Sequence, residues 1–98
     1  MRIKRSDVFL NWHKKLKDSV GKQIIDRRID QLSKGNPGEV EPIGEGCSEM
    51  KIHYGPGYRV YFKDTGKEVI LLLWGGDKST QQNDIEKAKK IARAYKEE

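Results

Sequence analysis

The first half of the chain has hydrophobic residues at helical spacing. Between residues 7 and 16 they recur every three or four positions, with lysines between them. Residues 19–33 continue the same period after Asp18 and Ser19, either of which could cap a helix N-terminus. A Gly-Asn-Pro sequence then marks a helix end. The pattern predicts a hairpin of two amphipathic helices, and it allows a short strand over residues 2–4.

From Glu39 onward the hydrophobic period changes to two. Apolar and polar residues alternate over residues 48–54 and over residues 58–63, on either side of a Gly-Pro-Gly turn. A further turn leads to residues 69–74, which are apolar at every position, as in a central strand covered on both faces. We therefore expect an antiparallel meander of at least three strands.

The last part of the chain reads as a turn followed by a helix. Gly75 and Gly76 are expected to break the preceding strand, and Ser79 and Gln82 have the spacing of a capping box. No repeat or linker divides the sequence, so residues 1–98 are expected to form a single α+β domain. Its helical hairpin would pack on an antiparallel sheet of three to five strands, with a C-terminal helix.

Composition and charge limit the classes of protein. Of 98 residues, 35% are hydrophobic and 36% are charged, so the core must be thin. The net charge of +5 favours a polyanionic partner such as nucleic acid, although lysine-rich helices can also be merely soluble. The longest apolar run is too short for a transmembrane helix, and the polar N-terminus lacks the apolar centre of a signal peptide. With a single cysteine, Cys47, these features predict a cytoplasmic protein.

Polar side chains share one face of the two alternating strands. They are Glu49, Lys51 and His53 on the first strand and Arg59, Tyr61 and Lys63 on the second. An arginine can hold a phosphate through two hydrogen bonds, a lysine adds positive charge, and histidine titrates near neutral pH. The set could bind a phosphodiester and move protons around it. The alternative is an ordinary solvated face on which charges pair across the strands.

Other forms of chemistry find little support in the sequence. The Gly-Gly-Asp-Lys-Ser segment lacks the spacing of a nucleotide-binding P-loop. His13, Cys47 and His53 lie in different predicted elements without the ligand spacing of a zinc site. Nothing near Cys47 indicates a lowered pKa, so we expect a small strand residue rather than a nucleophile. The sequence therefore predicts no metal and no cofactor.

Four segments together resemble the RelE/ParE toxin superfamily, and more narrowly its HigB-like addiction module killer branch. They are residues 12–18 (WHKKLKD), 29–38, 49–62 (EMKIHYGPGYRVYF) and 71–81 (LLLWGGDKSTQ). The resemblance covers nearly the whole chain and implies a RelE-like fold. It also implies the toxin half of a type II toxin–antitoxin pair. Such toxins typically cut mRNA in the ribosomal A site without a metal, leaving 2′,3′-cyclic phosphate and 5′-hydroxyl ends.

The resemblance also implies roles for individual residues. Arg59 matches the family's phosphate-binding arginine, Lys51 occupies a strand position that is usually basic, and Lys78 matches a basic residue that assists the leaving 5′-oxygen. The outer lysines expected to contact RNA are Lys14, Lys15 and Lys63.

One departure concerns the proton donor. Several ribosome-dependent members place a tyrosine or histidine near the start of the last helix, where residues 81–84 are here Gln-Gln-Asn-Asp. Either His53 or Tyr61 then supplies the proton, or the rate is lower, or the activity differs.

The resemblance further implies the partners. They are mRNA at the ribosomal A site and a helix-turn-helix, HigA-like antitoxin, with operator DNA bound only through the antitoxin and no membrane. Two alternatives remain open: a ParE-like toxin that poisons gyrase, and a non-enzymatic module that binds RNA or protein.

Overall fold

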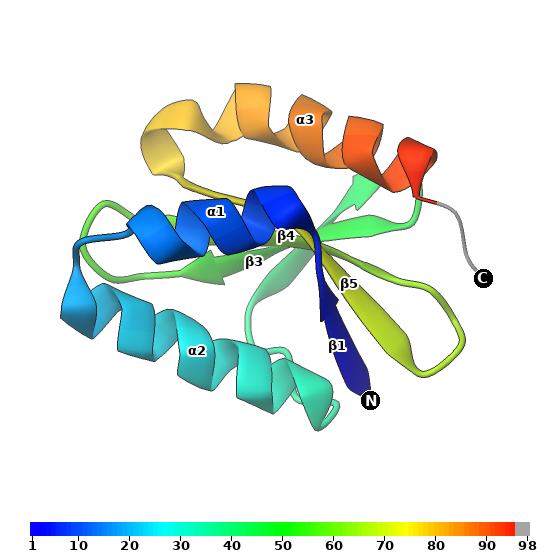
Figure 1. The fold of residues 1–98 in the computed structure, drawn as a ribbon, viewed down its shortest axis with the longest axis horizontal. Helices are drawn as coiled ribbons and strands as arrows, with labels where there is room; N and C mark the ends of the chain where they lie inside the picture. Colours follow the sequence, from blue (N-terminus) through cyan, green and yellow to red (C-terminus); the bar gives the residue numbers. More distant parts are fainter. Residues whose placement is uncertain (96–98) are drawn as a thin grey trace.

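A five-stranded sheet runs through the computed structural model, which describes residues 1–95 (Figure 1). In chain order the elements are β1 (Arg2–Arg5), α1 (Asp7–Lys15), α2 (Ser19–Ser33), β2 (Val40–Gly44), β3 (Cys47–Ile52), β4 (Tyr58–Asp64), β5 (Val69–Asp77), the short 3₁₀ helix η1 (Lys78–Thr80) and α3 (Gln81–Ala94). The strand order is β1-β5-β4-β3-β2; β1 lies parallel to β5, and every other neighbouring pair is antiparallel. The predicted α+β class, with its helical hairpin, meander and C-terminal helix, is confirmed.

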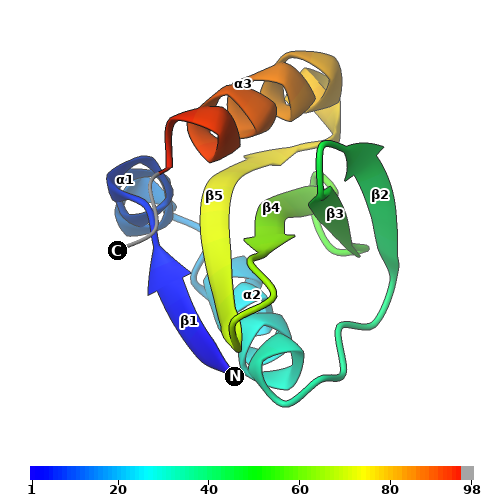
Figure 2. The ribbon, with the colours of Figure 1, turned by 90° about the vertical axis from the view of Figure 1, so that its right-hand side faces the viewer.

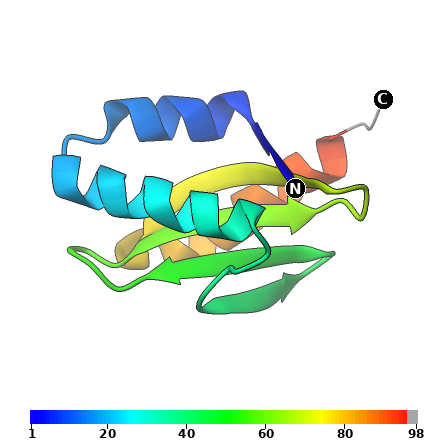
Figure 3. The same ribbon diagram turned by 90° about the horizontal axis from the view of Figure 1, so that it is seen from below.

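Helices cover both faces of the sheet. Figures 2 and 3 show α1 and α2 on one face and α3 on the other. The core beneath α1 and α2 includes Phe9, Ile25, Ile29, Met50, Ile52, Val60, Ile70 and Leu72. The core beneath α3 includes Cys47, Tyr61, Leu71, Leu73, Ala88 and Ala92. Successive residues of β5 thus enter opposite cores, as predicted for a strand covered on both sides.

Side chains cap both helices of the hairpin. Ser6 Oγ accepts a hydrogen bond from the backbone N–H of Phe9 (3.0 Å) at the start of α1. Asp18 Oδ1 accepts one from the N–H of Gly21 (2.9 Å) at the start of α2. Each bond satisfies a backbone donor that the first helical turn leaves unpaired. Asp18 is therefore the cap, one of the two residues that the sequence allowed.

Both edge strands were weakly marked in the sequence. β1 is the short strand allowed over residues 2–4, and it pairs along β5 from Arg2 opposite Val69. β2 pairs with β3 but contains Pro42, which is tolerated because the strand lies at the edge of the sheet. The sheet therefore has the largest number of strands in the expected range.

The prediction that Gly75 and Gly76 end the last strand is wrong. β5 continues through both residues to Asp77. The glycines instead make room for side chains on the two faces of the strand: a Cβ on Gly75 would overlap the indole of Trp12, and one on Gly76 would overlap the carboxylate of Asp84. A glycine inside a strand can mark such a close approach rather than a break.

The predicted capping box at Ser79 and Gln82 is also wrong. Asp77 performs the capping: its Oδ1 accepts a hydrogen bond from the backbone N–H of Ser79 (2.8 Å) and starts η1. α3 begins at Gln81, after Thr80, whose side chain does not cap the helix. Within residues 1–95, no helix is long and apolar enough to cross a membrane.

Candidate active site

The strand register brings the two central cations of the predicted site together. Lys51 on β3 lies directly opposite Arg59 on β4, and Glu49 lies opposite Tyr61. The alternation predicted from the sequence is therefore correct, and all four side chains belong to the sheet face on which α3 packs. α3 begins above Glu49, so this face is only partly open to solvent.

Arg59 is buried and ion-paired. Its Nε donates to Glu49 Oε1 (3.0 Å), and its Nη1 donates to the carbonyls of Gly57 (3.0 Å) and Tyr58 (3.3 Å). Gln81, at the start of α3, donates to the same Glu49 oxygen (2.6 Å). Arg59 is 6% exposed and Glu49 is 1% exposed. A buried charge pair held by further hydrogen bonds fixes the orientation of the guanidinium.

A solvent-filled hollow of about 360 Å³ lies beside Arg59, beneath the β3–β4 turn. It is lined by residues 53–57, Arg59 and Lys78. Arg59 lines the hollow, and among the described residues its Nη2 has no hydrogen-bond partner. Gly57 adopts a left-handed conformation (φ +80°), and a Cβ on it would lie 3.4 Å from Arg59 Nη1 and 3.3 Å from Cβ of Lys78. A small residue at this position keeps the hollow open.

Two glutamates, one in β2 and one directly before it, partner Lys51 of β3 and His53, which follows β3. Lys51 Nζ lies 3.0 Å from Glu41 Oε2, and Nε2 of His53 lies 3.0 Å from Glu39 Oε2. The hydrogen bond with His53 lowers the pKa of the Glu39 carboxyl. His53 is exposed at the rim of the hollow, whereas Lys51 is half-buried and does not line it. A carboxylate on one nitrogen of an imidazole orients the ring.

Tyr61 occupies the expected face but lies in the core. The ring is fully buried beneath α3, and its hydroxyl has no hydrogen-bond partner among the described residues. Burial raises the pKa of the Tyr61 phenol, and the nearby carboxylates of Glu49 and Asp84 raise it further. The interpretation of this side chain as part of an accessible polar face is wrong, because α3 covers it.

The three outer lysines do not converge on the hollow. Lys63 lies at the opposite end of β4 from Arg59. Its side chain passes close to Gly46, where an added Cβ would lie 3.5 Å from Cε of Lys63. Lys14 and Lys15 are exposed in the last turn of α1. Figure 1 shows that this end of α1 and the β3–β4 turn lie at the same end of the molecule. Lys78, at the rim of the hollow, is exposed.

Within the part of the chain that the structure describes, neither the thiol of Cys47 nor a metal-binding cluster provides a second candidate catalytic centre. Burial raises the pKa of the Cys47 thiol, which opposes formation of a nucleophilic thiolate. Within residues 1–95, no group of three His, Cys, Asp or Glu side chains could hold a metal ion. Sequence reasoning missed the contributions of Gln81, Glu39 and Glu41, and only the acidic alternation before β3 could have indicated the last two.

A relative establishes the family of the chain. No protein-family model matches the sequence. A protein of Haemophilus influenzae described as uncharacterized is 42% identical over 92 residues, which cover 94% of this chain and 93% of that protein. The chain belongs to the same family. Two proteins that share this much sequence over almost their whole length share one fold, and this family extends over the complete meander and all three helices.

Solved structures identify the fold of this family. The free E. coli toxin RelE, carrying two arginine-to-alanine substitutions, matches with a TM-score of 0.63 at 17% identity, over 91% of this chain and 94% of that one. The intact E. coli RelBE toxin–antitoxin complex contains a chain that matches with a TM-score of 0.53 at 20% identity, over 78% of this chain and 94% of that one. The RelE-like fold is confirmed, while the HigB-like subdivision stays a prediction.

Proposed function

We propose that this protein is the toxin of a type II toxin–antitoxin pair and cleaves mRNA on the ribosome without a metal ion. The observation that carries the proposal is the hollow at the β3–β4 turn, where Arg59 of β4 meets Lys78 of η1 and a histidine lies at the rim. These groups match the requirements of phosphodiester transfer: positive charge at the phosphate and groups that exchange protons. The RelE fold supports the same function by analogy.

The roles follow from position. Arg59 lines the hollow, and its guanidinium would neutralise charge on the phosphate as the 2′-oxygen attacks. His53, oriented by Glu39, would accept the 2′-hydroxyl proton. Lys78 would assist departure of the 5′-oxygen from the other side of the hollow. Lys51, paired with Glu41, lies opposite Arg59 on the neighbouring strand and would add positive charge beside it. Tyr61 has no role in this scheme, because it lies in the core.

The decisive experiment is cleavage of mRNA by purified ribosomes, with and without EDTA. The wild-type protein should produce 2′,3′-cyclic phosphate and 5′-hydroxyl ends in both conditions. Loss of one such charge contact costs on the order of 3 kcal/mol in the transition state, so Arg59→Ala should lower the rate by about a hundredfold.

Arg59→Ala leaves Glu49 buried without its partner and could unfold the protein. Arg59→Ala combined with Glu49→Gln removes that charge, and Arg59→Lys keeps a cation without the planar fork. Circular dichroism checks that each variant is folded. Cleavage by the folded double variant at the wild-type rate would overturn the proposal, as would inactivity of the wild-type protein.

The proposed partner is an antitoxin encoded beside this chain. The RelBE structure holds a toxin with its antitoxin, and the present chain shares the fold of that complex's matching chain. We expect a small helix-turn-helix protein that binds this chain and connects it to operator DNA. Co-expression with the neighbouring reading frame should restore growth that this chain alone arrests.

One observation favours the two alternatives, a gyrase poison and a non-enzymatic binding module. Arg59 donates three hydrogen bonds, to Glu49, Gly57 and Tyr58, and this arrangement suits a structural role as well as a catalytic one. A supercoiling assay that gives stabilised DNA breaks with intact mRNA would identify the gyrase poison. RNA or protein binding without growth arrest would identify the binding module.

A further inference from the structure

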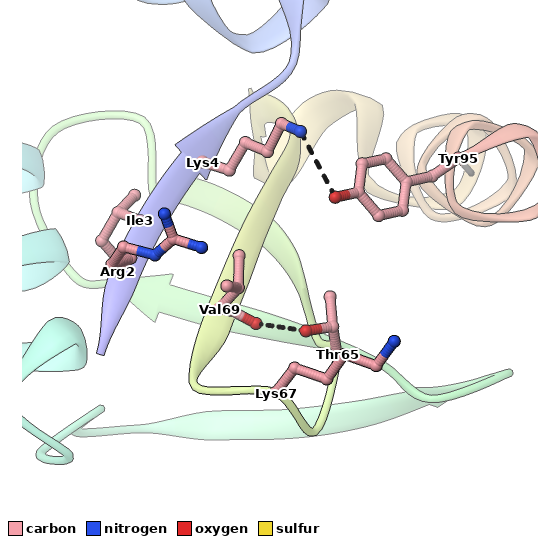
Figure 4. Close-up of a pocket in the computed structure, with 7 residues that line it drawn as sticks. All are labelled: Arg2, Ile3, Lys4, Thr65, Lys67, Val69 and Tyr95. Carbon is pink, nitrogen blue, oxygen red and sulfur yellow. Dashed lines mark hydrogen bonds between the residues drawn. The ribbon is translucent and has the colours of Figure 1, made fainter. Parts of the chain in front are cut away.

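A second concave site lies at the other end of β5 from Arg59. Its volume is about 340 Å³, and it is formed by β1, the β4–β5 turn and the end of α3 (Figure 4). Three of the side chains that line it are cationic: Arg2 and Lys4 on β1 and Lys67 in the turn. No acidic residue lines it within the part of the chain that the structure describes. A concave surface with charges of one sign concentrates ligands of the opposite sign.

Tyr95 adds an aromatic surface to these cations. Lys4 Nζ lies 5.2 Å from the centre of the Tyr95 ring and 3.5 Å from its hydroxyl. Figure 4 shows the ring and the ammonium group on the same side of β1. The contact joins the first strand to the end of the last helix. It places an aromatic ring beside cations, as in surfaces on which nucleic acid bases stack.

Backbone and side-chain bonds define the shape of the site. The N–H of Arg2 donates to the carbonyl of Glu68 (2.9 Å), which ties β1 to the β4–β5 turn. The hydroxyl of Thr65 donates to the carbonyl of Val69 (2.9 Å) and closes that turn. The nearby carboxylate of Asp64 accepts a hydrogen bond from the N–H of Gly66 (2.9 Å). Asp64 borders a different hollow, on the opposite face of the sheet. The cations are thus held on a framed surface that no acidic residue lines within residues 1–95.

We propose that this site binds a nucleotide of single-stranded RNA, with a backbone phosphate on Arg2 and Lys4 and a base on Tyr95. Residues two apart in a strand lie roughly 7 Å from each other, a spacing similar to that of successive phosphates in an extended single strand. An acidic peptide would use the cations but has no need of the partly exposed ring of Tyr95. The ring therefore favours RNA. Only the choice of mRNA as the natural ligand rests on the function proposed above.

The two sites lie at opposite ends of one strand. β5 leads from Val69, which lines the second site, to Asp77, which pairs with Tyr58 beside Arg59. Eight residue steps correspond to roughly 27 Å. A short single strand laid along the α3 side could reach both sites. The second site would then hold the RNA while its phosphodiester lies at Arg59.

The test measures equilibrium binding of a fluorescent oligoribonucleotide of about eight nucleotides, long enough to span the sheet. Its 2′-hydroxyls are methylated, so that cleavage cannot occur. Arg2→Gln with Lys4→Gln should weaken binding by about tenfold and reduce the salt dependence by roughly two phosphate contacts. The matched control, Arg27→Gln with Lys90→Gln, removes the same charge from exposed positions of α2 and α3 and should bind within about twofold of wild type.

Tyr95 variants separate stacking from charge. Tyr95→Phe should bind as the wild type does, whereas Tyr95→Leu should lose about fivefold or more in affinity. Equal weakening by the two charge-removing pairs would overturn the proposal. Tighter binding of a polyglutamate peptide than of RNA, with no effect of Tyr95→Leu, would overturn it in favour of an acidic protein partner. Because the readout is binding, failure of mRNA cleavage would refute the proposed function and leave this result standing.

Discussion

The hydroxyl of Tyr58 lies 2.8 Å from Oδ2 of Asp18, the residue that caps α2. The other oxygen of the same carboxylate accepts the N–H of Gly21. Tyr58 immediately precedes Arg59 on β4, so one carboxylate connects the start of α2 to the strand that carries the proposed phosphate ligand. The helical hairpin therefore supports the site from the face opposite α3.

This bond predicts how stability changes with pH. The Gly21 N–H and the Tyr58 hydroxyl lower the pKa of Asp18, so its contribution is present above the ordinary carboxyl pKa and is lost as the pH falls below it. Burial and the bond to Asp18 raise the pKa of Tyr58 to about 12. The contribution of Tyr58 is therefore complete below about pH 10 and is lost as the pH rises through about 12.

Tyr58→Phe tests the same bond. It should lower the free energy of unfolding by about 1 kcal/mol at neutral pH and should flatten the loss of stability at high pH. Asp18→Asn should instead flatten the acid side of the profile. Urea unfolding measured from acid to alkaline pH checks both variants. Identical profiles for the wild type and Tyr58→Phe would refute the assignment.

Gly75→Ala should be strongly destabilising, because its Cβ would enter the indole of Trp12. We expect a loss of about 2–3 kcal/mol in the free energy of unfolding, measured in urea. The control is a double-mutant cycle with Trp12→Ala. In that background the added methyl group should cost much less, because the obstructing ring is gone. Additive losses would show that the strand, rather than the indole, rejects alanine.

Asp84→Ala should also destabilise the protein. Oδ1 of this buried carboxylate accepts the indole N–H of Trp74 (2.9 Å), and Oδ2 accepts the Thr80 hydroxyl (2.5 Å). Alanine leaves both donors without that acceptor, at a cost of about 2 kcal/mol. Asp84→Asn keeps one acceptor oxygen and should cost less. Thermal unfolding distinguishes the variants, and equal melting temperatures for alanine and wild type would contradict the expectation.

Tyr61→Phe should leave both mRNA cleavage and fold intact. The hydroxyl is buried without a partner among the described residues, so its removal should leave stability unchanged or raise it by about 1 kcal/mol. Urea unfolding and the ribosome assay give the two readouts. A folded but inactive Tyr61→Phe protein would restore this residue as a proton donor.

Lys78→Ala should slow mRNA cleavage by about ten- to a hundredfold, because the lysine borders the hollow beside Arg59. The melting temperature should not change, since the side chain is exposed. Lys90→Ala removes the same charge from an exposed part of α3 away from the hollow and should cleave at the wild-type rate. Equal rates for the two variants would exclude Lys78 from the proposed site.

The period of hydrophobic residues was sufficient to predict the strands and their faces. Met50, Ile52 and Val60 enter the core beneath α1 and α2, as the alternation indicated. The same alternation could not show what covers the other face. Glu49 and Arg59 satisfy each other inside the protein, and a polar pair of this kind has the same sequence pattern as a solvated surface.

Glycines and caps were harder to interpret for a related reason. Gly75 and Gly76 have the sequence of a strand break, but the side chains they accommodate come from α1 and α3, far away in the sequence. The sequence predicted Ser79 as the cap, and only the backbone geometry of η1 shows that Asp77 performs the capping. Local patterns therefore predicted the elements, while contacts between distant residues determined the details of the site.

The parallel pairing of β1 with β5 also constrains the order of folding. Arg2 lies opposite Val69, so β1 can join the sheet only after β5 has been synthesised. Contacts this distant in sequence form slowly, whereas the α1–α2 hairpin needs only local ones. We expect a nascent chain with a formed hairpin and an open sheet until β5 has left the ribosome. The complete sheet, and both sites that depend on it, would thus form only after β5 has been synthesised.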